Sequence, residues 1–265
     1  VVAGGLTYVI FLGQEAAIAV LLIVSIGLLL RSYRSHKRKV ANVGVVAGLR
    51  KFESKTVQGI IDESADNISN AMGRVAKSYG SMIDGLANMD EDELNDNRKR
   101  VDKLDGEVED LRNHLFYFIK NLDETSVRGS NFYITILAYL TDMAQSLEYL
   151  AKKSYKHVNN NHKALHPDQL HELRTIGSDV NVVVSQVKAL FEARDFDGLS
   201  AVLEAQEALL ARISDVIDAQ ISRTRTEESS PRNTTLFFNL ALETKDLIKA
   251  LMSLVEEYRN SATNT

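Results

Sequence analysis

Residues 132–162 read FYITILAYLTDMAQSLEYLAKKSYKHVNNNH, and apolar side chains recur there at three- and four-residue steps. This spacing places them on one face of an α-helix. The inward-facing residues that it predicts are Phe132, Ile136, Leu137, Leu140, Met143, Leu147 and Leu150. The stretch therefore predicts a long helix, from about residue 131 to about residue 158, that packs against other helices along most of its length.

The same spacing recurs in five other stretches, so the fold class that we expect is all-α with six helices. Polar breaks separate the stretches, and both prolines of the chain, Pro167 and Pro231, lie in such breaks. The predicted apolar stripe of the second helix includes Ile119 and ends at Leu122, and that of the fifth helix ends at Ile221. No stretch shows the two-residue alternation of a half-buried strand.

A weak internal repeat divides the six helices into two sets of three. An offset of 104 residues aligns the third helix with the sixth and pairs Ile134 with Phe238, Ile136 with Leu240, Asp142 with Asp246, Leu147 with Leu251 and Leu150 with Leu254. We therefore expect residues 40–265 to form two tandem antiparallel three-helix bundles, the first over 50–162 and the second over 163–265.

A membrane segment is predicted ahead of this body. The run AAIAVLLIVSIGLLL, residues 16–30, is uncharged, and with Leu12 and Gly13 it approaches the ~20 residues that cross a bilayer. The basic cluster RSYRSHKRK, residues 31–39, follows it and favours the cytoplasmic side. We expect residues 1–39 to be a transmembrane helix of the inner membrane with a basic flank, and residues 40–265 to lie in the cytoplasm. Because the chain begins at Val1, we also expect it to be part of a longer membrane protein.

Composition narrows the function classes. Residues 40–265 carry a net charge of −9, which disfavours nucleic acid as a partner. The chain has no cysteine, which excludes disulfides and thiolate metal sites. It also lacks the phosphate-binding glycine loop, the nucleophile elbow and the paired-histidine zinc motif, so we expect no enzyme.

Two stretches resemble a known family. Residues 132–162 and the ending TLFFNLALETKDLIKALMSLVEEY, residues 235–258, are similar to the PhoU-like C-terminal domain of PiT-type inorganic phosphate transporters of the Bacteroidetes kind. The resemblance covers about residues 50–260 and implies a regulatory domain that gates or docks onto a sodium- or proton-coupled transporter. The Gly-Ala-Asn-Asp stretch of the transporter family is absent from this chain, so the pore would lie elsewhere.

Members of the PhoU family can bind metal through acidic residues one helical turn apart, and the resemblance makes five residues candidates for a divalent or transition metal. They are Asp62, Asp66, Asp142, Glu243 and Asp246. Both copies of the third helix depart from the family pattern of Glu and Asp four residues apart. The residue four positions after Asp142 is Ser146, and the residue four positions before Asp246 is Leu242. Ion pairing of these carboxylates with lysine or arginine is the alternative that we favour, and no other cofactor is expected.

The most distinctive polar segment is YKHVNNNH, residues 155–162. Its residues His157, Asn159, Asn160, Asn161 and His162 are a candidate partner-binding loop, and a plain polar helix connection is the alternative. The partners that we expect are the transporter domain of the same protein and the lipid bilayer, with a homo-oligomer left open. A membrane-tethered helical signalling or scaffold module is the competing function, although the strong breaks between the helices favour the transporter domain.

Overall fold

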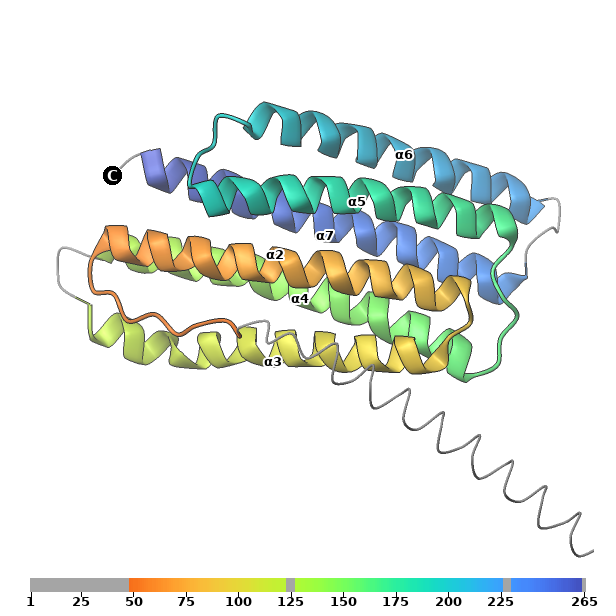
Figure 1. The fold of residues 1–265 in the computed structure, drawn as a ribbon, viewed down its shortest axis with the longest axis horizontal. Coiled ribbons are helices and arrows are strands. Elements are labelled where there is room, and N and C mark those ends of the chain that lie inside the picture. Colours follow the sequence, from red (N-terminus) through yellow and green to blue (C-terminus); the bar gives the residue numbers. More distant parts are fainter. Residues whose placement is uncertain (1–47, 123–126, 226–229, 264–265) are drawn as a thin grey trace, which may run out of the picture. The chain divides into compact units, whose positions relative to one another are not determined.

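The structure, a computed structural model, describes residues 48–122, 127–225 and 230–263. Within these residues the body is all-α, as predicted, and no strand occurs. The six helices, labelled as in Figure 1, are α2 (Val57–Ala87), α3 (Glu91–Lys120), α4 (Val127–Asn159), α5 (Pro167–Ala193), α6 (Leu199–Arg225) and α7 (Pro231–Thr263).

The helices begin where the sequence supplies caps. Thr56 accepts the Gly59 backbone N–H at the start of α2, and Asp90 accepts the Glu93 N–H at the start of α3. Pro167 is the first residue of α5, where its missing N–H costs no hydrogen bond. These local signals explain why the predicted breaks lie close to the observed ones.

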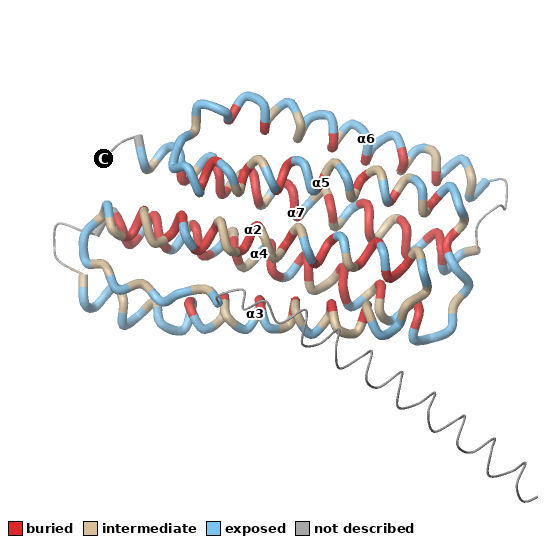
Figure 2. The backbone as a smooth tube through the Cα atoms, viewed as in Figure 1, coloured by how far each residue is buried: buried red, intermediate tan, exposed pale blue. Residues whose placement is uncertain are grey.

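Consecutive helices run antiparallel, and α3 and α6 lie at opposite edges of the body (Figure 1). Helices α2, α3 and α4 pack on one another, and so do α5, α6 and α7. The two triplets are also joined, because α2 packs along α5 and α4 packs along α7. Buried residues therefore lie along the inner faces of α2, α4, α5 and α7 (Figure 2). Their hydrophobic side chains form one continuous core.

Two residues of the predicted stripes are exposed. Ile119 on α3 is exposed, and so is Ile221 on α6. Each lies in the last turns of an edge helix, and the helices that pack extensively against each edge helix belong to its own triplet. Periodicity predicts a helical face correctly there, but it does not predict how far along the helix a neighbour covers that face.

The predicted transmembrane helix and its basic flank, residues 1–39, lie outside the described residues. Across residues 48–122, 127–225 and 230–263, none of the helices combines the length and the apolar character that crossing a membrane requires.

Candidate functional site

The asparagine run of the candidate loop ends α4. Asn161 adopts a left-handed conformation with φ 53°, which asparagine tolerates better than most residues. The Asn161 N–H donates to the Val158 carbonyl, and the His162 N–H donates to the His157 carbonyl. These bonds satisfy carbonyls that the end of the helix would otherwise leave free. The run therefore has a local role, and it also sets the direction in which His162 leaves the helix.

His157 is a buried support for this loop. Its side chain is 4% exposed, and its Nε2 lies 2.9 Å from the Lys163 carbonyl oxygen, to which it donates. Its ring meets the ring of His162 edge to face at 5.3 Å. Burial lowers the pKa of His157, so the ring is neutral at pH 7 and holds the loop by a hydrogen bond. His157 is thus placed to fix the loop that carries His162.

The first turn of α7 lies against the same loop. Asn233 donates through Nδ2 to the Ala164 carbonyl oxygen at 2.8 Å, which ties the start of α7 to the segment between α4 and α5. Nη1 of Arg232 lies 2.8 Å from Nε2 of His162, to which it donates. Two residues that are 70 positions apart in sequence therefore face each other at one end of the body.

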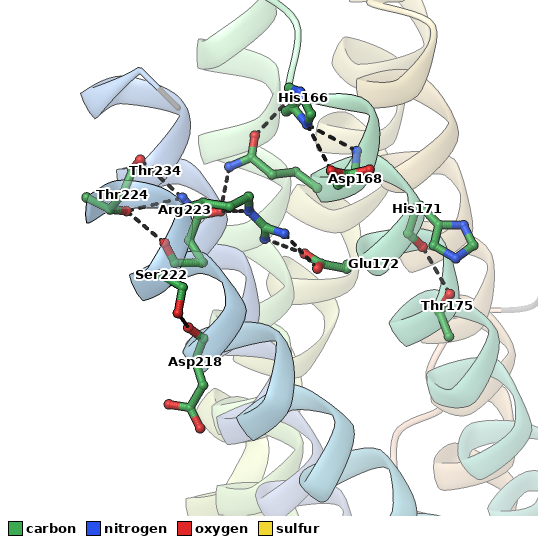
Figure 3. A network of polar contacts seen from close by, with 12 residues as sticks. His166, Asp168, His171, Glu172, Thr175, Asp218, Ser222, Arg223, Thr224 and Thr234 are labelled. Carbon is green, nitrogen blue, oxygen red and sulfur yellow. Dashed lines mark hydrogen bonds and ion pairs between the residues drawn. The ribbon is translucent and has the colours of Figure 1, made fainter. Parts of the chain in front are cut away.

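A buried polar network also fixes the start of α7 (Figure 3). Gln220 on α6 donates to the Thr234 hydroxyl on α7 and accepts a hydrogen bond from Gln169 on α5. Next to them Arg223 forms a two-pronged ion pair with Glu172, with N···O distances of 2.8 and 2.5 Å. A bidentate guanidinium–carboxylate pair has a preferred geometry, so the network holds the ends of three helices in register.

A cavity of about 380 Å³ opens between the end of α4, the loop and the start of α7. Its lining includes two amides and a hydroxyl, from Asn160, Asn239 and Thr235, but no carboxylate. The basic groups that line it are Lys153, Lys156, His162 and Arg232. His157, Asn160 and His162 of the predicted loop contribute to the cavity, whereas Asn159 and Asn161 do not.

Sequence reasoning missed Lys153, Lys156 and Arg232. The two lysines lie three residues apart and within one turn of His157, so a helical projection of α4 would have grouped them. No sequence signal connects Arg232 to this group, because only the packing of α7 along α4 brings it there.

The acidic candidates are dispersed over the body. Asp62 and Asp66 lie together on α2, and Arg194 at the end of α5 pairs with both, at 3.5 Å and 2.8 Å. Asp246 on α7 pairs with Lys249. These contacts are the ion pairing that the sequence analysis favoured over a metal.

The remaining two acidic candidates do not complete a cluster. Asp142 is an exposed residue of α4, and Glu243 is half-buried on α7. In the part of the chain that the structure describes, no three histidine or acidic side chains come together as metal ligands would.

A second surface feature lies at the opposite end of the body, in the last turns of α3. Phe116 and Tyr117 are 68% and 63% exposed, and Ile119 lies beside them. A cavity of about 500 Å³ adjoins them, between α3 and the extended segment 48–56, and its lining includes Phe118 and Tyr133. The signal in the sequence is that Phe116 and Tyr117 lie off the buried stripe of their helix, as aromatic residues on a charged helix face.

Comparisons with known proteins identify the fold. No family model matches the chain, and no curated protein matches it in sequence. The crystal structure of the phosphate transport system regulatory protein PhoU from Streptococcus pneumoniae superposes with a TM-score of 0.63 at 11% sequence identity. The match covers 79% of this chain and 98% of that chain. The part of the chain that the structure describes therefore has a PhoU-like all-helical fold.

Proposed function

We propose that this chain is the regulatory domain of a membrane transporter for inorganic phosphate and that it gates or docks onto the transporter without catalysing a reaction. The PhoU-like fold carries this proposal, because the matched structure is that of a phosphate transport system regulatory protein and almost the whole of it is covered. The absence of catalytic motifs from the sequence is consistent with a regulatory role.

The proposal includes a direct attachment to the membrane. The apolar run at residues 12–30 would be the last helix of a PiT-type transporter, driven by sodium or protons, and the basic flank at 31–39 would keep the body in the cytoplasm. This arrangement makes the transporter domain of the same protein the partner of the body.

The exposed aromatic end of α3 is the surface that we assign to this docking. The Leu49 N–H donates to Glu107 in the middle of α3, so the chain enters the described body along this helix. At 1.5 Å per residue, Tyr117 lies about 15 Å further along the same helix. Exposed Phe116 and Tyr117 thus form an apolar surface on the helix along which the chain enters, where a tethered partner can reach it.

Phosphate uptake by the complete protein tests the proposal. The cheapest first step is to read the coding sequence ahead of Val1: several further spans with the Gly-Ala-Asn-Asp motif support it, and a single extracellular sensor domain favours the scaffold alternative. Radiolabelled phosphate uptake is then compared between the complete transporter and one truncated after residue 47, at equal amounts in the membrane. We expect truncation to abolish the response of uptake to external phosphate, and an unchanged response would refute a regulatory role.

The docking surface has a matched control. Replacing Phe116 and Tyr117 by serine should alter regulated uptake as truncation does, because it removes the apolar contact without touching the core. Serine at Ile221, which is 48% exposed at the end of the opposite edge helix, should have no effect. If the two variants behave alike, the last turns of α3 are not the docking surface.

A further inference from the structure

The cavity between α4 and α7 brings together cations that have no carboxylate partner. Residues 40–265 carry nine more acidic than basic groups, and several arginines of the body lie in ion pairs, such as Arg74 with Glu107 and Arg212 with Asp179. Lys153, Lys156 and Arg232 have no carboxylate partner among the described residues. Three unneutralised charges thus share one hollow on an acidic protein.

The chemistry of the lining suits an oxyanion. Lysine and arginine offer only donors, and the amide groups of Asn160 and Asn239 and the Thr235 hydroxyl can donate as well. The cavity lies at the first turn of α7, whose partial positive charge also favours an anion. With no carboxylate in the lining, the cavity lacks the charged oxygen ligands that Ca²⁺ and Mg²⁺ prefer.

The cavity is held in shape before any ligand arrives. Arg232 lies against His162, and the loop of His162 is itself fixed by the buried hydrogen bond from His157 to Lys163. Asn233 and Thr234 anchor the first turn of α7 on its two other sides. A site that is already ordered loses less conformational entropy on binding, so its charges can contribute more to affinity.

We propose that this cavity binds a small phosphorylated molecule. Arginine and lysine are the usual partners of phosphate oxygens, and three positive charges match a ligand with more than one negative charge. The volume of about 380 Å³ falls within the range of about 300–1,000 Å³ of small-molecule sites. Free phosphate and a larger phosphorylated compound share this chemistry, and the experiment separates them.

Isothermal titration of the 265-residue chain, kept in mild detergent because of its apolar run, provides the test. The probes are inorganic phosphate, pyrophosphate and ATP, each without divalent metal and at low salt. We expect saturable binding of at least one probe and weaker binding at higher salt. Arg232→Gln and Lys156→Gln should each weaken binding about tenfold or more, because each removes a charged donor.

Lys163→Gln is the matched control. Lys163 lies in the same loop and is exposed, but its side chain does not line the cavity, so its loss should change affinity less than threefold, or about 0.6 kcal/mol. Binding of inorganic phosphate alone would identify the free ion, and tighter binding of pyrophosphate or ATP a larger ligand. The absence of saturable binding by all three probes, or equal weakening by all three substitutions, would overturn the proposal. The measurement involves no transporter, so its outcome is separate from that of the uptake experiment.

Discussion

The hydrogen bond between Tyr79 and Thr244 joins the two triplets and yields the sharpest prediction. The Tyr79 hydroxyl on α2 lies 2.7 Å from the Thr244 hydroxyl on α7, and both side chains are buried. Thr244 also donates its single proton to the Leu240 carbonyl, so Tyr79 must be the donor between them. Burial raises the pKa of Tyr79, which keeps this donor protonated at any ordinary pH.

The two substitutions that break this bond should differ in cost. Tyr79→Phe removes the donor and leaves Thr244 with its bond to Leu240, so we expect a loss of about 0.5–1.5 kcal/mol in the free energy of unfolding. Thr244→Val preserves the shape but leaves the Tyr79 O–H without a partner in the core, and the expected loss is about 1–3 kcal/mol. The double variant has no orphaned donor, and it should lose less than the sum by roughly 1 kcal/mol.

Urea unfolding followed by circular dichroism measures all three variants. At this size each kcal/mol corresponds to about 2–4 °C in melting temperature, so thermal melts provide a second readout. The reasoning is refuted if Thr244→Val costs no more than Tyr79→Phe, or if the double variant loses the full sum. Either result would mean that the hydroxyls do not meet across the joint between the triplets.

Three further predictions concern pH, helix packing and metal. Burial lowers the pKa of His157, so the unfolded chain takes up a proton at a higher pH than the folded chain does. The free energy of unfolding should therefore be highest above the ordinary pKa of 6.5 and should fall as the pH drops below it. His157→Gln should reduce this difference between urea melts at about pH 7.5 and about pH 5.5. Gly85→Ala should cost about 1–3 kcal/mol, because its Cβ would lie 2.6 Å from Cγ of buried Leu94, whereas Gly80→Ala in the same helix meets nothing and should gain about 0.5–1 kcal/mol; a stabilising Gly85→Ala would contradict the packing. Elemental analysis of the purified chain should find only substoichiometric transition metal, and a stoichiometric amount would revive the acidic candidates.

The candidate site could be predicted only in part. The loop from His157 to His162 stands out because of its asparagines, and the structure places three of its five named residues in the lining of the cavity. Asp62 and Asp66 form ion pairs with Arg194, which lies 128 residues from Asp66 in the sequence. Arg194 also has a left-handed backbone conformation, which no local sequence pattern predicts. The spacing of two carboxylates along the sequence predicts that they share a helix face, but it does not predict which cation neutralises them.

The sequence by itself determined the class of structure. Apolar residues at three- and four-residue steps require helices that bury one face. The caps Thr56 and Asp90 and the first-turn proline Pro167 set where three of those helices begin. These are short-range effects, in which the residues that decide lie within one or two turns of one another.

Only the tertiary structure decided which buried face meets which. An apolar stripe specifies that a helix packs, but it is compatible with many partners, and the pairing of α2 with α5 and of α4 with α7 depends on the combined shape of all the side chains. The same long-range packing brings Arg232 to His162 and leaves the last turns of α3 uncovered. The cavity between α4 and α7 and the exposed last turns of α3 both result from this packing, because each depends on where one helix ends relative to another.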